Sequence, residues 1–393
     1  MKKQKLILAY SGGLDTSCCL KWLQDKGFEV ICFSANLGSE FLPEEIKTKA
    51  KQGGASKVYV KDLRKEFSQD YILSALKAGA LYQNKYLLST ALGRPLIAKY
   101  LVEIAKSENA KFVAHGCSGK GNDQIRLELA VKSLAPELEI VAPLRSWELN
   151  SREEEIDYAK KNNISVESTK NKIYSIDKNI WGVSIEAGLL EDLGNSVPEE
   201  AFILTRSAQE APENSEKLEI EFFKGKPVKV NKKSISLTHL IEKLNKIGGR
   251  HAIGRTDLVE DRVVGIKSRE IYEAPAAWIL YKALAEIKEL VFTKEMLEFK
   301  EIIAERYADL TYRGFWFYEL KNSLDAFLEE SSNKLTGKVR FKLYKGNIIT
   351  LKRSSKYSQY KKSLATYGKK DSFSREWAEG FINILANPFR RGK

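Results

Sequence analysis

The chain has 393 residues, 43% of them hydrophobic, and its 65 lysines and arginines outnumber its 52 aspartates and glutamates, for a formal net charge of +13. This length is too great for one ordinary core and predicts two domains and a tail. No apolar run reaches the roughly 18 to 20 residues that a membrane-spanning helix needs, and the apolar stretch at residues 6–10 is too short for a secretory signal. We therefore expect a cytoplasmic protein that binds no membrane.

The cysteines and the positive net charge exclude few classes of function. Cys18, Cys19, Cys32 and Cys117 form no C-x-x-C pair and are too few for a disulfide framework in so long a chain. We therefore expect reduced and mostly buried thiols. A positive net charge suits a nucleic-acid-binding protein as well as an enzyme with anionic substrates, so it does not separate these classes.

The first 165 residues alternate between strand and helix patterns. Short apolar runs bounded by polar residues or glycine predict buried strands at residues 5–10, 28–35, 56–62, 110–116 and 138–144. Between them, apolar residues recur at helical spacing, for example over residues 16–23 and 97–105. Apolar strands separated by helices predict a doubly wound parallel α/β sheet, whose ligands bind at the carboxyl ends of the strands.

The segment SGGLDTS, residues 11–17, lies where the first predicted strand passes into the first predicted helix. Its glycines let backbone N–H groups approach an anion, and the helix dipole favours negative charge there, so the segment is predicted to bind phosphate. It is not a Walker A loop, and the nearest spacing to one, Gly116 to Gly121, is followed by Asn122 where lysine is needed. The segment also lacks the G-x-G-x-x-G dinucleotide fingerprint.

The pattern changes after about residue 165. Strand-like runs around glycine predict hairpins at residues 217–231 and 337–353, and helical patterns occupy residues 236–247, 276–291 and 294–309. Together they predict a second, α+β domain. Residues 360–393 form a tail with an amphipathic helical segment, which either docks on another subunit or packs against its own chain.

The phosphate-binding segment has the form S-G-G-x-D-[ST]-S, which resembles the pyrophosphate loop of ATP pyrophosphatases. Five further stretches, at residues 85–95, 115–126, 174–188, 259–276 and 311–317, resemble the argininosuccinate synthase family in their order and spacing. The resemblance covers nearly the whole chain. It implies an adenine nucleotide alpha hydrolase-like ATP-binding domain at 1–165, a synthetase and multimerisation domain at 166–359, and a C-terminal helical oligomerisation arm at 360–393.

The resemblance also implies the reaction, which is the ATP-dependent condensation of L-citrulline with L-aspartate to argininosuccinate. This ligase reaction of arginine biosynthesis passes through a citrullyl-adenylate and releases AMP and pyrophosphate. The family further implies a homotetramer. Pyrophosphate chemistry leads us to expect Mg²⁺ with the ATP, and we expect no nucleic-acid partner. Such chemistry depends on alignment and on anion stabilisation more than on a protein nucleophile, so we expect the cysteines to be structural.

The family's site residues match positions of this chain. The resemblance implies that ATP contacts Ala9, Tyr10, Ser11, Gly12, Gly13, Leu14, Asp15, Thr16, Ser17, Ala35 and Gly116. It assigns the aspartate substrate to Ser118, Asn122 and Asp123. It assigns citrulline to Tyr86, Thr90, Asn122, Arg126, Ser175, Ser184, Glu260 and Tyr272. Catalytic roles are implied for Ser11, Asp15, Asp123 and Arg126, and no cluster of metal ligands stands out.

One position departs from the family pattern. Ala91 stands where a serine is usual, so a hydroxyl expected near the citrulline carboxylate is missing, at a cost of about 0.5 to 1.5 kcal/mol. Thr90 or Ser89 are candidates to replace that hydroxyl. Two other functions stay open at this point: a tRNA-modifying ATP pyrophosphatase, which we expect to carry cysteine pairs or an RNA-binding domain, and a non-catalytic nucleotide-binding subunit.

Overall fold

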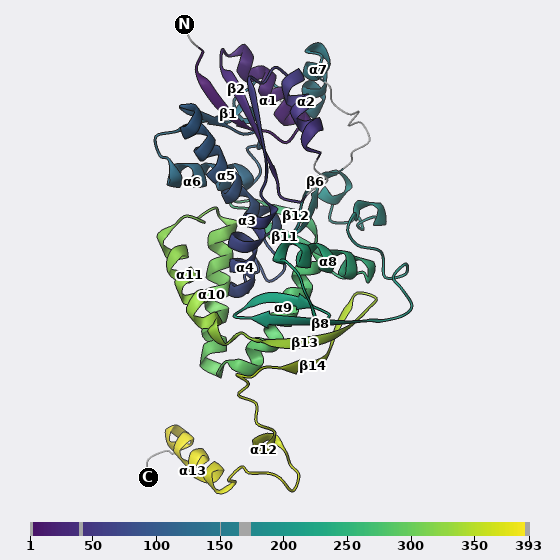
Figure 1. Ribbon diagram of the computed structural model, residues 1–393, viewed down its shortest axis with the longest axis vertical. Coiled ribbons are helices and arrows are strands. Elements are labelled where there is room, and N and C mark those ends of the chain that lie inside the picture. Colours follow the sequence, from purple (N-terminus) through teal and green to yellow (C-terminus); the bar gives the residue numbers. More distant parts are fainter. Residues whose placement is uncertain (1–2, 39–41, 150, 165–173, 390–393) are drawn as a thin grey trace.

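The N-terminal part of the chain is built on a five-stranded parallel sheet. The computed structural model describes residues 3–38, 42–149, 151–164 and 174–389 (Figure 1). The strands run in the order β3-β2-β1-β4-β5, and each neighbouring pair is parallel. Their bounds are β1 Lys5–Ala9, β2 Glu29–Asn36, β3 Lys57–Asp62, β4 Phe112–Ala114 and β5 Glu139–Val141. All five predicted strands are therefore confirmed, and β1 lies at the centre.

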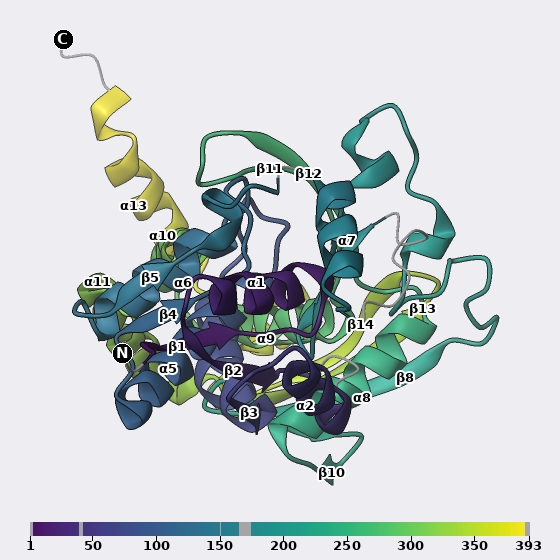
Figure 2. The ribbon, with the colours of Figure 1, turned by 90° about the horizontal axis from the view of Figure 1, so that it is seen from above.

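Helices cover both faces of this sheet (Figure 2). Because side chains alternate along a strand, Leu6 and Leu8 of β1 pack with residues of α1, α2 and α7, whereas Ile7 packs with α5 and α6. The inner residues of β1, β2 and β4 are buried, which explains why these strands are apolar, whereas the edge strands β3 and β5 are only partly buried. The helices are α1 Leu14–Asp25, α2 Pro43–Gln52, α5 Ser89–Glu108, α6 Asp123–Leu134 and α7 Arg152–Lys161.

The second part of the chain has two antiparallel sheets and four long helices, as predicted for an α+β domain. One sheet has the order β11-β12-β7-β6, with β6 Ser175–Asn179, β7 Gly182–Glu186, β11 Arg255–Asp261 and β12 Lys267–Glu273. The other has the order β10-β9-β8-β13-β14, with β8 Glu216–Phe223, β9 Lys226–Val230, β10 Lys233–Ser234, β13 Gly337–Tyr344 and β14 Asn347–Ser354. The long helices are α8 Leu237–Arg250, α9 Pro275–Val291, α10 Lys294–Tyr312 and α11 Glu319–Ser331.

Residues 64–88 precede α5 in the chain but pack against the second part of the molecule. They contain α3 Arg64–Glu66, the π-helix η1 Phe67–Ile72 and α4 Leu73–Ala78. The Tyr281 hydroxyl of α9 donates to the carbonyls of Ala75 (3.1 Å) and Ala80 (2.8 Å), and the hydroxyls of Ser68 and Thr238 lie 2.8 Å apart. One hydrophobic cluster consequently runs from one face of the parallel sheet into the second part of the molecule.

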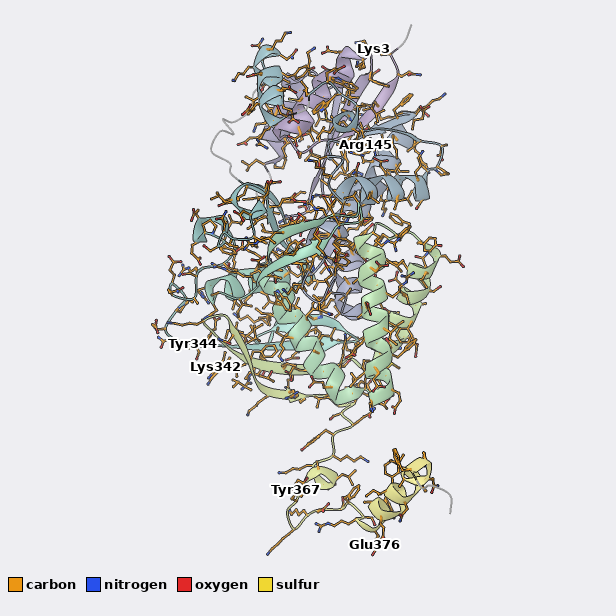
Figure 3. The ribbon with its side chains drawn as sticks, turned by 180° about the vertical axis from the view of Figure 1, so that it is seen from behind. Lys3, Arg145, Lys342, Tyr344, Tyr367 and Glu376 are labelled. Carbon is orange, nitrogen blue, oxygen red and sulfur yellow. The ribbon has the colours of Figure 1, made fainter. Side chains whose placement is uncertain are left out.

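The C-terminal arm projects away from the rest of the molecule (Figures 1 and 3). It contains α12 Lys362–Ala365 and α13 Glu376–Leu385, and Figure 3 places Tyr367 and Glu376 on this separate arm. Trp377 of α13 is 75% exposed. The remaining elements are short turns: η2 Pro143–Arg145, η4 Gly188–Glu191, η5 Glu199–Ala201, η6 Ser332–Lys334 and η7 Asn387–Phe389. Within the described residues, none of the helices is both long and apolar enough to cross a membrane.

Candidate active site

The loop between β1 and α1 presents backbone donors at the carboxyl edge of the parallel sheet. Gly12 turns the chain with a φ of +80°, a conformation that favours glycine, and Gly13 is the N-cap of α1. The first helical hydrogen bond runs from the Ser17 N–H to the Gly13 carbonyl (3.0 Å), so the N–H groups of residues 14–16 precede it. Such a helix start, with its dipole, is suited to bind phosphate.

Hydroxyl groups hold this loop in shape. The Ser11 and Thr16 hydroxyl oxygens lie 3.0 Å apart, and the Gly13 N–H donates to Ser11 Oγ (3.3 Å). The hydroxyls of Tyr10 and Ser17 lie 3.1 Å apart beneath them. Ser11 is exposed whereas Thr16 and Ser17 are buried, so the loop offers one hydroxyl to a ligand and uses the others for support.

A cavity of about 300 Å³ extends from this loop across the ends of β1, β2 and β4. Of the predicted ATP residues, Ala9, Tyr10, Ser11, Thr16, Ala35 and Gly116 line it. Its apolar part is formed by Phe33, Leu37, Ile97 and Leu127, which suits a flat aromatic base. Gly12, Gly13, Leu14, Asp15 and Ser17 are outside the lining, because they form the turn and the start of α1.

Gly116, which follows β4, lies close to Thr16 at the start of α1. A Cβ atom at this residue would lie 3.0 Å from Thr16 Cγ2 and 3.7 Å from Cys19 Sγ. Only glycine leaves this side of the cavity open.

A second carboxylate faces Asp15. Glu155 of α7 is half-buried, and burial together with the Asp15 charge raises the pKa of Glu155 to about 7. Within the described residues, no group of three or more acidic, histidine or cysteine side chains could hold a metal, and Asp15 with Glu155 is a pair. All four cysteines are free thiols, and burial raises the pKa of Cys18 and Cys117 to about 12. None of them is suited to act as a nucleophile.

Next to the cavity, Asp123 lies between two guanidinium groups, of which that of Arg94 lines the cavity. Arg94 Nη2 lies 2.7 Å from Asp123 Oδ2 and also contacts Asp177, and Arg126 Nη1 lies 2.8 Å from Asp123 Oδ1. Burial raises the pKa of Asp123, but the charges of Arg94 and Arg126 outweigh it and lower the pKa to about 2. Arg94 and Asp177 also line the cavity, and neither residue was among the sequence-predicted site residues.

Glu260 is the centre of a buried group of polar side chains next to Arg126. Its carboxylate accepts hydrogen bonds from the hydroxyls of Tyr272 (2.6 Å) and Tyr312 (2.7 Å). Tyr312 also accepts from the amide of Asn122 (2.8 Å), and its carbonyl accepts from Arg126 Nε (2.8 Å). Burial raises the pKa of Glu260, and the two tyrosine hydroxyls oppose that shift. Tyr312 links three predicted residues, although sequence reasoning gave it no role.

Tyr86, Thr90 and Ser184 adjoin this group. The Tyr86 ring stacks on Tyr272 with centroids 4.1 Å apart, and its hydroxyl accepts from the N–H groups of Thr90 (3.0 Å) and Ala91 (3.2 Å). The Thr90 and Ser184 hydroxyl oxygens lie 3.2 Å apart. A hydroxyl is therefore present next to Ser184 even though the side chain at position 91 has none.

Two predicted substrate residues lie apart from these groups. Ser175 is exposed at the start of β6, opposite Glu186, and Ser118 is exposed in the loop before α6. His115, at the end of β4, has both ring nitrogens occupied: Nδ1 accepts from the Cys117 N–H (3.2 Å), and Nε2 lies 3.0 Å from Glu128 Oε1. These contacts give His115 a structural role.

Comparison with known proteins covers nearly the entire chain. The family model described as "Arginosuccinate synthase N-terminal HUP domain" matches residues 5–165, and the model described as "Arginosuccinate synthase C-terminal domain" matches residues 174–390. The argininosuccinate synthase of Chlorobium chlorochromatii is 51% identical over 385 residues, which are 98% of this chain and 96% of that protein. Those of Caldanaerobacter subterraneus and Carboxydothermus hydrogenoformans are 50% and 49% identical, each over 98% of this chain and over 94% and 97% of their own length.

Proposed function

This chain belongs to the argininosuccinate synthase family, and we propose that the cavity at the β1, β2 and β4 ends and the adjoining Asp123 and Glu260 groups are its active site. The family activity is that of an ATP-dependent ligase: L-citrulline and L-aspartate are condensed to argininosuccinate, with release of AMP and pyrophosphate, in arginine biosynthesis. One observation carries the proposal. Arg94 lines the nucleotide cavity and at the same time holds Asp123, so the sites for ATP and for the amino acids are contiguous.

ATP binds with its adenine in the apolar part of the cavity, near Ala35, and its phosphates at the start of α1. The ureido oxygen of citrulline attacks the α-phosphorus, the bond to the bridging oxygen breaks, and pyrophosphate departs toward the N–H groups of residues 14–16. Ser11 and Asp15 border this position. Stabilising the departing anion with preorganised dipoles is the largest contribution that this loop can make.

The amino-acid substrates replace the ion pairs that Asp123 and Arg126 make with each other. Asp123 keeps its negative charge because of its low pKa, so it binds the ammonium group of aspartate, and the family resemblance assigns Asn122 and the more distant Ser118 to the same substrate. Arg126 binds the carboxylate of citrulline, and Glu260, with Tyr272, binds its ammonium group. Tyr86, Thr90 and Ser184 complete the citrulline site, and Ser175, which lies apart from them at the start of β6, is assigned to citrulline by the family resemblance alone. The aspartate ammonium group first loses a proton to solvent, the resulting amine attacks the activated carbon and releases a second proton, and AMP leaves with the former ureido oxygen.

Steady-state kinetics test this assignment. We expect ATP to yield AMP and pyrophosphate, and only when both amino acids are present. Asp123→Asn is expected to raise the KM for aspartate at least tenfold, and Glu260→Gln the KM for citrulline, while the KM for ATP changes little. Glu137→Gln, an exposed carboxylate outside the site, is the control. Formation of ADP, or pyrophosphate release stimulated only by tRNA, would refute the assignment.

Mg²⁺ fits the carboxylate pair at the start of α1. Magnesium is commonly held by one or two carboxylates together with substrate phosphates, and Asp15 and Glu155 provide such a pair beside the proposed phosphate site. The ion neutralises phosphate charge when bound. We expect Glu155→Gln to raise the Mg²⁺ concentration needed for half-maximal rate several-fold without changing the KM for citrulline. The paired control is Glu154→Gln, one residue earlier on α7.

The proposal also covers the bounds of the domains, the oligomeric state and the location in the cell. The ATP-binding domain is residues 1–165, the synthetase domain 166–359 and the arm 360–393; the first boundary lies outside the described residues. The exposed apolar side of α13 supports docking on another subunit and hence a homotetramer. Free, buried thiols are what a cytoplasmic protein is expected to carry.

A further inference from the structure

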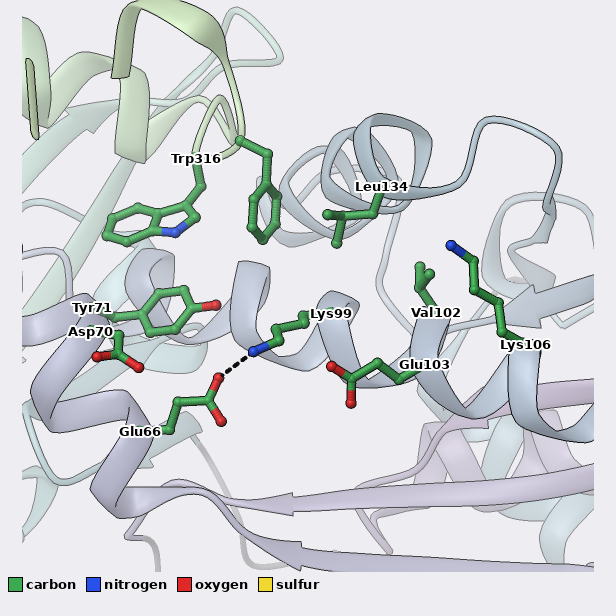
Figure 4. A pocket seen from close by; sticks show the side chains of 10 residues that line it. Glu66, Asp70, Tyr71, Lys99, Val102, Glu103, Lys106, Leu134 and Trp316 are labelled. Atoms are coloured by element: carbon green, nitrogen blue, oxygen red, sulfur yellow. Dashed lines mark hydrogen bonds and ion pairs between the residues drawn. The ribbon is translucent and has the colours of Figure 1, made fainter. Parts of the chain in front are cut away.

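Charged side chains also gather outside the residues assigned to the substrates. Figure 4 shows one such place, a cavity of about 410 Å³ in which Glu66 pairs with Lys99 (2.8 Å), and nothing among the described residues points to a ligand there. Another lies at the turn that joins β11 to β12, where Arg262 contacts two carboxylates. This turn also contacts the loop before α6, which carries residues assigned to the aspartate substrate.

The two carboxylates hold the Arg262 side chain in place. Its Nη2 contacts Glu186 of β7 and lies 2.5 Å from Oε1 of Glu270 on β12. Glu270 is 4% exposed and also accepts from the Ser268 hydroxyl (2.9 Å). Burial and the charges of Glu186 and Glu260 raise the pKa of Glu270 to about 8, and Arg262 opposes that shift. An arginine with charge-assisted hydrogen bonds to two carboxylates keeps one orientation, which fixes the start of the turn.

The turn at residues 262–266 is joined to the loop before α6 at two points. Within the turn, the Arg262 N–H donates to the Ile266 carbonyl (2.8 Å). Toward the loop, Arg262 Nη1 donates to the Lys120 carbonyl (3.3 Å), and the Val263 N–H donates to Asn122 Oδ1 (2.9 Å). The guanidinium group therefore links both carboxylates to the loop, and the backbone of the next residue makes the second contact.

The Val263 N–H determines how the side-chain amide of Asn122 is turned. Asn122 is 6% exposed, and its Nδ2 donates to the Tyr312 hydroxyl (2.8 Å), which in turn donates to Glu260 (2.7 Å). An amide turned the other way would bring its NH₂ group to the Val263 N–H, which is also a donor. The turn therefore fixes the orientation of an amide that the family resemblance assigns to both amino-acid substrates.

These contacts give Arg262 a role that rests on the proposed function. We propose that Arg262 is a positioning residue for the aspartate substrate: it anchors the turn at 262–266, and the turn holds Asn122 and the Lys120 carbonyl next to Asp123, the first residue of α6. Without this anchor, the loop before α6 adopts other orientations, and a smaller fraction of molecules binds aspartate productively. None of these residues lines the nucleotide cavity, so the effect falls on the amino acids and not on ATP.

Steady-state kinetics of Arg262→Met test this role, with Arg269→Met as the matched control. Arg269 lies on the same hairpin, has 9% of its side chain exposed and pairs with Asp257 of β11 (2.7 Å). We expect Arg262→Met to raise the KM for aspartate at least tenfold, the KM for citrulline less, and the KM for ATP little. Arg262→Lys keeps a cation beside Glu186 and Glu270 but lacks the planar fork, so it is expected to raise the KM for aspartate only about threefold.

Hydrogen exchange gives a readout that does not depend on turnover. In the folded protein without substrates, we expect the amides of residues 117–122 to exchange faster in Arg262→Met than in the parent and in Arg269→Met. A KM for aspartate equal to that of the parent, or an equal rise in the KM for all three substrates, would overturn the inference.

Two further comparisons keep the test decisive. If Arg262→Met does not fold, Arg262→Lys is compared with Arg269→Lys: a KM for aspartate raised only in the first is expected, and equal values would overturn the inference. Turnover of the parent without aspartate would refute the proposed function instead, whereas the difference in exchange between the two methionine variants would still report the anchor.

Discussion

Glu273 is a fully buried carboxylate that holds a loop by accepting hydrogen bonds. It accepts from the backbone N–H groups of Ile203 (2.8 Å), Leu204 (3.0 Å) and Thr205 (2.8 Å) and from the Thr205 hydroxyl (2.7 Å). When one of its oxygens is replaced with an NH₂ group, that group is a hydrogen-bond donor and faces the N–H groups of the loop, which are also donors. Glu273→Gln is therefore expected to lower the free energy of unfolding by about 1.5 to 3 kcal/mol, the range for hydrogen bonds to a charged group.

Urea unfolding followed by circular dichroism measures this change. Glu200→Gln, which removes a nearby exposed carboxylate, is the control and is expected to leave the midpoint unchanged. Equal midpoints for Glu273→Gln and the parent would show that the carboxylate does not hold the loop.

Lys300 is a buried amine, and keeping it charged lowers the free energy of unfolding. It is 3% exposed, donates to Ser331 Oγ (3.1 Å) and lies between the rings of Phe292 and Phe327. Burial, followed by the charges of Lys288 and Lys77, lowers the pKa of Lys300 to about 7. The unfolded chain therefore binds more protons than the folded chain between about pH 7 and about pH 10.4, so this group makes stability rise with pH in that interval.

Lys300→Met is expected to remove this pH dependence. The variant should gain about 1 to 3 kcal/mol at pH 6, where the buried ammonium is charged, and less at pH 9. Thermal unfolding of parent and variant at both pH values measures the difference, and Lys294→Met, at an exposed lysine on the same helix, is the control. A stabilisation of the same size at both pH values would mean that packing, and not charge, causes it.

Local pattern was sufficient to predict the shape of the loop after β1 and not the contacts around Asp123. Ser11 and Thr16 belong to one contiguous strand, turn and helix start, so their place at the carboxyl edge of the sheet could be predicted from seven residues, and their role toward phosphate stays a prediction. Tyr312, Arg94 and Asp177 come from distant positions, and they meet only through the packing of the two parts of the chain. Their local sequences do not distinguish them from ordinary surface or packing residues.

At the scale of elements, the approach of the β4 loop to the β1 loop sets the width of the nucleotide cavity. Gly116→Ala would place a methyl group 3.0 Å from Thr16 Cγ2 and 3.6 Å from the Thr16 backbone nitrogen, which is tighter than an ordinary van der Waals contact at the first of these atoms. We expect the KM for ATP to rise at least tenfold, the KM for citrulline to rise less, and the thermal midpoint to change little. Gly380→Ala, where the added atom meets nothing within 4 Å, is the matched control.

Initial rates at varied ATP concentration measure this effect. An unchanged KM for ATP in Gly116→Ala would show that the nucleotide does not occupy this cavity. A lower kcat alone would mean that the loop affects a later step.

The sequence predicted the positions of the helices and strands better than it predicted which of them pack together. The parallel strands, the two hairpins and the long helices α8, α9 and α10 lie where hydrophobic periodicity predicted them. The association of residues 64–88 with the second part of the molecule was not predicted. That association depends on contacts such as Tyr281 with Ala80, for which no periodic pattern exists.

At the scale of the whole molecule, the apolar side chains of the C-terminal arm are exposed and do not pack into a hydrophobic core of their own chain. Trp377, Phe381, Ile384 and Leu385 of α13 are 75%, 63%, 68% and 56% exposed, and they share one side of the helix. A ten-residue helix is marginal in water on its own, so its stability requires a partner surface. The tether begins at residue 360, directly after Gln359, whose N–H donates to the Leu290 carbonyl (2.7 Å).

We predict that the arm holds the subunits of the homotetramer together, and that the rest of each chain folds without the arm. Removal of residues 361–393 leaves Gln359 and its contact in place, so the truncated protein should keep its circular dichroism spectrum and unfold cooperatively. Light scattering coupled to gel filtration is expected to give a tetramer for the full chain and a smaller species for the truncated one. The double variant Trp377→Ser and Phe381→Ser is expected to reproduce the smaller species, because it removes apolar area from the docking side alone. If the truncated protein is still a tetramer, the subunit contacts lie on the part of the chain before the arm, and the apolar side of the arm does not make them.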